Sequence, residues 1–304
     1  HVARVSGPTV TADAWTGVRD GALVLRTGDQ RATVPLEDVI EISLGTPPDP
    51  PRSPSAEEVA VDLWSGEMLV GTIAAGDEFA LTVRSPLLGD VRVDVDAVAG
   101  LRFPQRMEQA AEPPELRTPE ARDVVHLTGG DRIDCTLTAF EQHGLICSTQ
   151  SDESLRVPYA RMTALRLMPT GWEPAGPPQL TAVLRDGTRV SGSRPRIEDG
   201  RLLLDGVSGI PLGFAISDAV SVLSRGDAFR YLTDLPPPEV VIEPFWEPVA
   251  GDPAAVYAPR ADRAFSGGLL TAGGRAWLKG FGVYSGTTLR FALDGEWREL
   301  RTHV

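Results

Sequence analysis

The chain has 304 residues, a hydrophobic content of 42% and a formal net charge of −13. This length predicts more than one domain. The acidic charge argues against a nucleic-acid partner, because phosphates are bound by neutralising them with Lys and Arg. The sequence has no run of 18 or more apolar residues, so we expect no membrane insertion.

From the first residue to about residue 226, one sequence unit recurs four times. Each copy opens with a short apolar run and a turn that carries a glycine, at Gly7, Gly66, Gly130 and Gly187. An alternating strand, a second turn and a dense apolar strand follow. The glycine lies 15 residues before the central leucine of that apolar strand in three copies and 16 residues before it in the first copy.

The hydrophobic periodicity of each unit is two, the period of a strand. In "VRVDVDAV" it places Val91, Val93 and Val95 on one face of a strand, with charges on the other. Turn residues at intervals of about 8–12 positions are the all-β signal. Five short strands in about 45 residues predict a small SH3-like or Sm-like barrel, which is marginal alone. We therefore expect neighbouring barrels to pack together or pair edge strands.

Proline-rich stretches separate the units and define the domain prediction. The expected order is repeat 1 (1–45), linker (46–58), repeat 2 (59–103), linker (104–122), repeat 3 (123–168), linker (169–178), repeat 4 (179–226) and a different C-terminal domain (227–304). The strand faces of the repeats show no aromatic ladder. We therefore expect the repeats to be spacer and interaction modules rather than readers of peptides, glycans or RNA.

Two tryptophans and two cysteines fall within the repeats. Trp15 and Trp64 lie in strand-like runs, which favours core packing over ligand stacking. Cys135 and Cys147 lie on adjacent strand-like runs and could form a disulfide, although two small buried side chains is the simpler interpretation. Neither cysteine has a partner at metal-ligand spacing, so we expect no metal site and no cofactor.

The last 78 residues have no counterpart among the repeats. They contain "YLTDLPP" at 231–237, "RADRAFSGGLLTAGGRAWLKGFGVYS" at 260–285 and "LRFALDGEWRELRTHV" at 289–304. This segment resembles the start of the NPCBM/NEW2 family, the carbohydrate-binding module found beside family 98 glycoside hydrolases. It departs from the family at Tyr284, where the family commonly has His. The resemblance implies a galactose-binding-like β-sandwich, a jelly roll.

The same resemblance carries further expectations. It implies a carbohydrate partner, a secreted or cell-envelope (periplasmic) location, and a modular protein of the type found in planctomycetes. Because the family's domain extends beyond the resembling segment, and because the chain starts inside a strand-like run, we expect the sequence to be a fragment of a longer protein.

The residues of this segment also predict a sandwich without the family. Leu289, Phe291 and Leu293 alternate inward, and an Asp-Gly turn at 294–295 predicts a hairpin whose return strand opens at Trp297. Gly273-Gly274 predicts a second tight turn. Gly280 and Gly282 flank Phe281, as expected where backbones pack closely.

Sugars are held by aromatic faces and by planar hydrogen-bonding side chains. The candidate carbohydrate-binding residues are Trp246, Tyr257, Arg260, Asp262, Arg263, Trp277, Lys279 and Tyr284. Each has a structural alternative. Trp277 would belong to the core, Arg263 would pair with Asp262 at the surface, and Lys279 would be solvated.

We expect no catalytic activity in this chain. The sequence contains none of the motifs G-x-S-x-G, H-E-x-x-H and G-x-x-x-x-G-K-[ST], and its four histidines are dispersed. We therefore predict a non-catalytic protein with a carbohydrate-binding domain on a scaffold of β-barrel repeats. Two alternatives remain open: a structural or protein-interaction scaffold without sugar binding, and an accessory region of a larger glycoside hydrolase.

Overall fold

The computed structural model describes residues 1–44, 54–107, 122–245, 256–265, 270–272, 275–295 and 297–302. The chain divides into two compact units, His1–Gly226 and Asp227–Val304. In the part described, both units consist of antiparallel strands, short 3₁₀ turns and one short α-helix, α1 (Pro104–Met107). The all-β prediction is confirmed. None of the described helices is long and apolar enough to span a bilayer.

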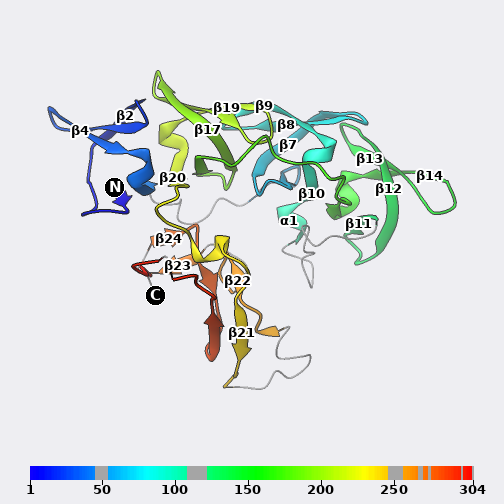
Figure 1. The fold of residues 1–304 in the computed structure, drawn as a ribbon. Coiled ribbons are helices and arrows are strands. Elements are labelled where there is room, and N and C mark those ends of the chain that lie inside the picture. Colours follow the sequence, from blue (N-terminus) through cyan, green and yellow to red (C-terminus); the bar gives the residue numbers. More distant parts are fainter. Residues whose placement is uncertain are drawn as a thin grey trace. The chain divides into compact units, whose positions relative to one another are not determined.

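The first unit contains the same element order four times: four strands, a 3₁₀ helix and a fifth strand (Figure 1). Repeat 1 has β1 (Val2–Arg4), β2 (Ala14–Arg19), β3 (Ala22–Thr27), β4 (Gln30–Pro35), η1 (Leu36–Asp38) and β5 (Val39–Ser43). Repeat 2 has β6 (Val59–Leu63), β7 (Met68–Gly76), β8 (Ala80–Ser85), β9 (Gly89–Asp94), η2 (Val95–Ala97) and β10 (Val98–Arg102). Repeat 3 has β11 (Asp123–Leu127), β12 (Arg132–Phe140), β13 (Gly144–Ser148), β14 (Ser154–Pro158), η3 (Tyr159–Arg161) and β15 (Met162–Arg166). Repeat 4 has β16 (Leu180–Leu184), β17 (Arg189–Glu198), β18 (Arg201–Gly206), β19 (Pro211–Ala215), η4 (Ile216–Asp218) and β20 (Ala219–Ser224).

The residues explain why these elements form. In β9, Val91 and Val93 are buried while Asp90, Arg92 and Asp94, which alternate with them, are exposed, as the period of two predicts. The four first-turn glycines all adopt the left-handed conformation, with φ between 83° and 93°, which side chains disfavour. The 3₁₀ helices were not predicted. Their signal is an apolar pair three residues apart, such as Val95 and Val98, which interrupts the period of two.

Within each repeat, the fifth strand pairs antiparallel with the first. These pairs are β1–β5, β6–β10, β11–β15 and β16–β20. Strands two, three and four form a meander in every repeat. The residue-by-residue ladders place the fourth strand against the third and the fifth strand against the first. The predicted closed barrels are therefore not confirmed by the strand pairings.

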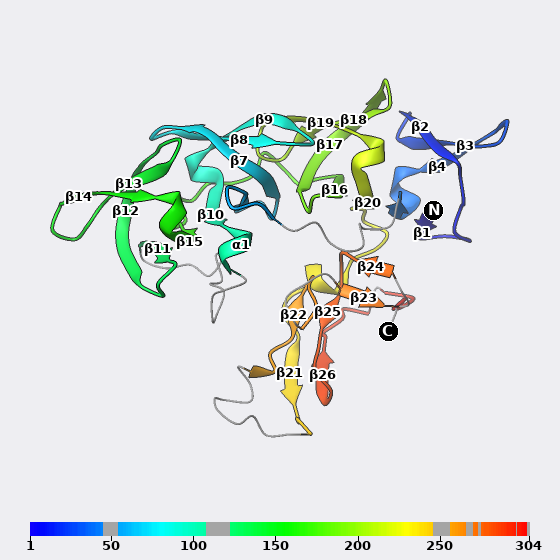
Figure 2. The same cartoon turned by 180° about the vertical axis from the view of Figure 1, so that it is seen from behind.

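The repeats are joined through their strands, but not in sequence order. β5 of repeat 1 pairs with β20 of repeat 4, β10 of repeat 2 pairs with β15 of repeat 3, and β17 of repeat 4 pairs with β7 of repeat 2. The order in space is 1-4-2-3, as both views of the ribbon show (Figures 1 and 2). The prediction that repeats pair their edge strands is confirmed, whereas the order was not predicted.

The junctions between repeats are locally two-fold symmetric. Ile42 lies opposite Val222, and Leu101 lies opposite Leu165. Each of these four residues lies 35 positions after the first-turn glycine of its own repeat. The same position therefore forms the midpoint of both fifth-strand junctions. We call the third junction, between β7 and β17, the central junction.

The tryptophans and cysteines expected in the core of the first unit are buried, except for Trp64, which is half-buried. Trp15 lies on β2 with 6% exposure, whereas Trp64 lies in the turn after β6, outside the strand. Cys135 and Cys147 lie on the paired strands β12 and β13, and both are buried free thiols. Burial raises the pKa of both thiols, which disfavours the reactive thiolate. This state matches two small apolar side chains.

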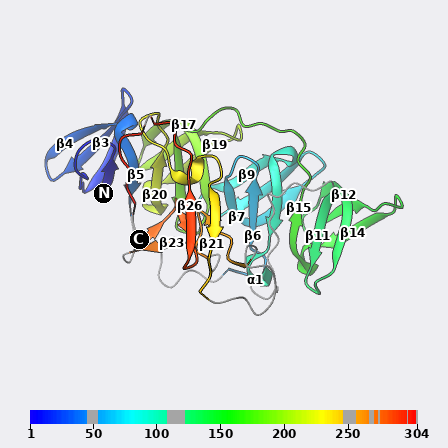
Figure 3. The same cartoon turned by 60° about the horizontal axis from the view of Figure 1, so that its bottom comes forward.

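The second unit has short strands. Its described elements are η5 (Leu232–Asp234), β21 (Glu239–Ile242), β22 (Arg260–Ala261), β23 (Leu270–Ala272), β24 (Arg275–Trp277), β25 (Phe281–Gly282) and β26 (Thr287–Arg290). They form three two-stranded sheets: β21–β26, β22–β25 and β23–β24. β21 and β26 lie side by side in all three views (Figure 3). These sheets do not show the predicted sandwich.

Two details of the second unit differ from the sequence prediction, and one agrees with it. The prediction of a hairpin at Asp294-Gly295 is wrong. Residues 291–295 and 297–302 contain no strand, and β26 pairs with β21 instead. Leu293, expected inward, is 53% exposed. The close packing at Gly282 is confirmed, since a side chain there would collide with the backbone of Arg263 and Phe265. The Gly273-Gly274 turn lies outside the described residues.

Candidate functional site

The only lysine of the chain holds together an ionic cluster in the second unit. Lys279 Nζ donates to Asp234 Oδ1 at 2.6 Å and to Asp262 Oδ2 at 2.8 Å. All three side chains are about one-fifth exposed. Asp262 has φ of 58°, and its Oδ1 accepts the backbone N–H of Gly280 at 3.3 Å. The cluster therefore ties the 3₁₀ helix η5 to the loop before β25.

Three aromatic rings form a second cluster nearby in the sequence. Tyr257 and Tyr284 stack with ring centroids 4.4 Å apart, and Phe265 lies 5.3 Å from Tyr284. The guanidinium of Arg260 lies 5.8 Å from the centroid of Phe265, within cation–π range. Tyr257 is buried, with 8% exposure. One face of the Tyr284 ring is therefore covered by a ring of the same protein.

The remaining predicted residues do not join these two clusters in the described contacts. Trp277 lies on β24, and its Nε1 donates to the carbonyl of Ala272 at 3.2 Å. Arg263 is exposed, and the described ion pair of Asp262 is with Lys279. Trp246 lies outside the described residues. The expectation of a solvated Lys279 is wrong, because its ammonium group forms ion pairs with two carboxylates.

Sequence reasoning missed two members of these clusters. Asp234 lies in the quoted "YLTDL" stretch, and it would have been found by asking which carboxylates the single lysine needs. Phe265 completes the aromatic group, but a lone phenylalanine among glycines gives no such signal. Tyr231 also contacts the cluster, since Lys279 Nζ lies 5.8 Å from its ring centroid.

Most side chains of the two clusters contact other groups of the same protein, so the clusters stabilise the fold as well as offering groups to a ligand. An exposed coplanar pair of Trp277 and Tyr284 would have favoured a sugar platform, yet both side chains are half-buried. Tyr284 stacks on a buried ring, and the Trp277 indole N–H is already bonded within the protein. Arg260 and Arg263 are the candidate side chains that are exposed, and Tyr284 is partly exposed.

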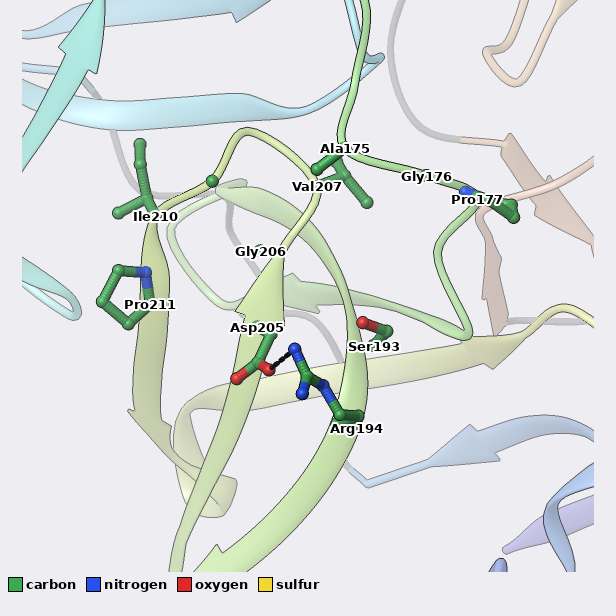
Figure 4. Close-up of a pocket in the computed structure, with 11 residues that line it drawn as sticks. Ala175, Gly176, Pro177, Ser193, Arg194, Asp205, Gly206, Val207, Ile210 and Pro211 are labelled. Atoms are coloured by element: carbon green, nitrogen blue, oxygen red, sulfur yellow. Dashed lines mark ion pairs between the residues drawn. The ribbon is translucent and has the colours of Figure 1, made fainter.

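A pocket of about 360 Å³ lies in repeat 4 (Figure 4). It opens between the linker at Ala175–Pro177, the middle of β17 at Ser193 and Arg194, and the β18–β19 turn. The register of β17 against β18 shifts between Ser193 and Arg196, and Arg194 has φ of 49°. Repeats 1, 2 and 3 skip one residue at the equivalent bulge, whereas repeat 4 skips two.

An ion-pair network forms the polar side of this pocket. Asp205 accepts from Arg194 at 2.7 Å and from Arg196 at 3.3 Å, as Figure 4 shows for Arg194. Val207 and Ile210 form the apolar side. The Arg194 side chain is 76% exposed, so its pairing with Asp205 contributes little to stability. The pocket offers charge and shape, but no nucleophile with an adjacent base.

Among the described residues of the first unit, the most buried carboxylate lies at the central junction. Glu67 is 1% exposed, and its Oε1 accepts the backbone N–H of Ser191 at 2.8 Å. Its Oε2 accepts the hydroxyl of Ser65 at 3.0 Å. Burial raises the pKa of Glu67, and hydrogen bonds from Ser191, Ser65 and Ser208 offset only part of that effect.

Within the described ranges, no group of His, Cys, Asp or Glu is arranged to hold a metal ion. Comparison with known proteins adds no relative: no family model, no curated protein and no solved structure matches this chain.

Proposed function

We propose that residues 1–226 form a rigid, non-catalytic scaffold for interactions with other proteins, and that the chain carries residues 227–304 as a second functional unit. One observation supports this proposal above all. Strand pairing joins repeats that are distant in the sequence, so the four repeats form one hydrogen-bonded body.

Three features of the junctions favour rigidity. The fifth-strand junctions are antiparallel ladders of three residue pairs each. Their side chains are buried, with Leu101 and Leu165 fully covered and Ile42 at 2% exposure. At the junction of repeats 1 and 4, Ser221 donates to Glu41 at 2.8 Å. Such contacts resemble a domain core more than a flexible tether.

The proposal extends to the shape of each repeat. The fifth strand pairs with the first, and a 3₁₀ helix lies between strands four and five. This order is the one expected of an SH3-like or Sm-like barrel, and we propose that each repeat is such a barrel. A secreted or cell-envelope location is likewise a proposal, supported by the family resemblance of residues 227–304.

Rigidity can be tested with spin labels on the first and third repeats. We would replace Asp29 and Gln150, which are exposed in turns, by cysteine for labelling. Cys135 and Cys147 are at most 1% exposed, so they should not react. Pulsed electron resonance should then give one narrow distance distribution. Glu67→Arg, which places a charge in the central junction, should broaden it. A broad distribution in the parent protein would refute the rigid scaffold.

A second function is carbohydrate binding by residues 227–304. The observation that favours it is that Phe265 contacts both the exposed Arg260 and the partly exposed Tyr284 ring, because a ring face and a planar guanidinium are groups that hold sugars. The NPCBM/NEW2 resemblance supports the same proposal. A glycan array with the whole chain should show binding that Tyr284→Ala removes while the circular dichroism spectrum stays unchanged. No binding on a broad array by the folded protein would exclude this function.

A further inference from the structure

The central junction is a reciprocal exchange of hydrogen bonds. Met68 of β7 lies opposite Arg189 of β17. Val70 N–H donates to Thr188 Oγ1 at 3.1 Å, and Ser191 N–H donates to Glu67 Oε1 at 2.8 Å. Glu67 and Thr188 each follow the first-turn glycine directly, and the two donors lie four residues after it. The same two positions therefore exchange donor and acceptor about a local two-fold axis.

Repeat 3 presents the same edge with the same chemistry. Asp131 directly follows Gly130 and supplies a side-chain acceptor, and Asp134 occupies the donor position. Asp134 faces Val124 of the first strand, as Val70 faces Ala60 and Ser191 faces Thr181. This shared register directs the Asp134 N–H outward. In the described part of the chain, β12 pairs only with β11 and β13.

Burial distinguishes the two edges. At the central junction Glu67, Val70, Thr188 and Ser191 are at most 6% exposed. At the equivalent positions of repeat 3, Asp131 and Asp134 are exposed. The edge of repeat 3 therefore has the same hydrogen-bonding groups as the central junction, but these residues are exposed to solvent instead of being buried by another repeat.

Repeat 1 lacks this edge at the other end of the array. Pro8 directly follows Gly7, so the acceptor position of repeat 1 has no side-chain acceptor. Between β1 and β2, the backbone forms only the single bridge of Val2 with Val10. Because one end can pair and the other cannot, pairing between copies would stop at two chains and close as a symmetric dimer.

We propose that the β12 edge of repeat 3 is a dimerisation surface for a second copy of this chain, with the register of the central junction. Arg132 would face Arg132 of the other copy, and the order of repeats would become 1-4-2-3-3-2-4-1. This inference deepens the scaffold proposal and rests on it.

The charges of the edge set how strong the dimer is. Arg132 pairs with Asp134 of its own strand at 2.7 Å. In the dimer, each Arg132 would also lie diagonally across from the other copy's Asp134, which offsets the repulsion between the two arginines. Asp131 leaves each edge with a net negative charge. We therefore expect a weak dimer that salt strengthens by screening.

Disulfide trapping tests the register directly. In Arg132→Cys, the two thiols would lie on directly opposed residues, whose Cα atoms are about 4.5–5.5 Å apart and suit a disulfide. Oxidised glutathione should convert this variant to a covalent dimer on a non-reducing gel. Asp134→Cys is the matched control. Its thiol would face Gly130 of the other copy and would have no thiol to bond with, so this variant should run as a monomer on the same gel.

Two further arms separate failure of the dimer from failure of the scaffold. Met68→Cys with Arg189→Cys should close an intrachain disulfide if the central junction exists. Sedimentation velocity of the parent chain should show a concentration-dependent dimer, which Asp134→Pro should weaken by about tenfold or more because proline removes the donor. Asp131→Ala should weaken it as well if Asp134→Pro fails to fold. A parent chain that stays monomeric, or a dimer unaffected by these changes, would overturn the proposal.

Discussion

The two units of the chain differ in how they bury apolar surface. Residues 1–226 contain four copies of a small unit, and their apolar faces join one buried cluster. In the described part of residues 227–304, Tyr257 and Leu278 are the buried hydrophobic residues, whereas Phe245 is 80% exposed and Leu300 is 68% exposed. The first unit gains stability from contacts between copies, and the second depends on local rings and ion pairs.

This difference shows what repetition contributes to a small β unit. A 45-residue unit buries too small a fraction of its surface to be stable alone. Pairing the fifth strands covers Leu101 with Leu165 and Ile42 with Val222, so each copy completes the core of another. The second unit has no such neighbour copy in the sequence. We expect it to unfold first on heating, in a separate transition.

The largest effect should come from the contact of repeats 2 and 3 at Phe140. This side chain is 1% exposed, and its backbone N–H bonds to Asp77 of repeat 2. Phe140→Ala should lower the free energy of unfolding of the first unit by about 3–5 kcal/mol. Urea unfolding followed by tryptophan fluorescence measures it. Phe79→Ala, at a phenylalanine that is 69% exposed, is the control and should change little.

A smaller effect should follow from removing the lysine of the second unit. Lys279→Met removes the ammonium group that binds both of the partly buried carboxylates of Asp234 and Asp262. We expect a loss of about 1–3 kcal/mol, confined to the lower-temperature transition in calorimetry. Arg290→Met breaks an exposed pair with Glu239 and should cost less than about 1 kcal/mol. Equal effects of the two changes would show that the cluster does not organise this unit.

The central junction should make the stability of the first unit depend on pH. The pKa of Glu67 is raised above 4.5 in the folded protein, so folding takes up a proton, and stability falls as pH rises from about 4.5 through the raised value. Glu67→Gln should remove this fall, and urea unfolding at a series of pH values would show it. Glu78→Gln, at an exposed position, should leave the dependence intact.

The smallest effect should come from a first-turn glycine. Gly130 has φ of 87° and no atom within 4 Å of an added Cβ, so Gly130→Ala adds backbone strain without a clash. We expect a loss of about 1 kcal/mol in urea unfolding. Gly129→Ala, next to it and without a positive φ, should cost less. A larger cost for Gly129→Ala would contradict the assignment of the turn.

The sequence predicted those parts of the fold that local chemistry determines. The spacing from each glycine, and the alternation in β9, follow from turn geometry and from the period of a strand, so the repeated unit was visible. The order 1-4-2-3 was not visible, because it depends on which edges of equivalent units meet. Only the details at Glu67, Thr188 and Pro8 distinguish one edge from another.

The candidate site was harder to predict for the same reason. Lys279, Asp262, Tyr257 and Tyr284 were singled out as residue types, but their partners come from elsewhere in the chain. Asp234 lies 45 residues before Lys279, and no local pattern connects them. The Asp294-Gly295 hairpin failed because β26 finds its partner in β21, so tertiary pairing overrode a strong local turn signal.

The most direct test of the account is the order of the repeats, measured by disulfide trapping within one chain. The account predicts that Met68→Cys with Arg189→Cys, which joins repeats 2 and 4, forms an intrachain disulfide at low protein concentration. It predicts that Met68→Cys with Arg132→Cys, at equivalent positions of the consecutive repeats 2 and 3, forms none. Trapping of the second pair and not the first would contradict the array and the scaffold built on it.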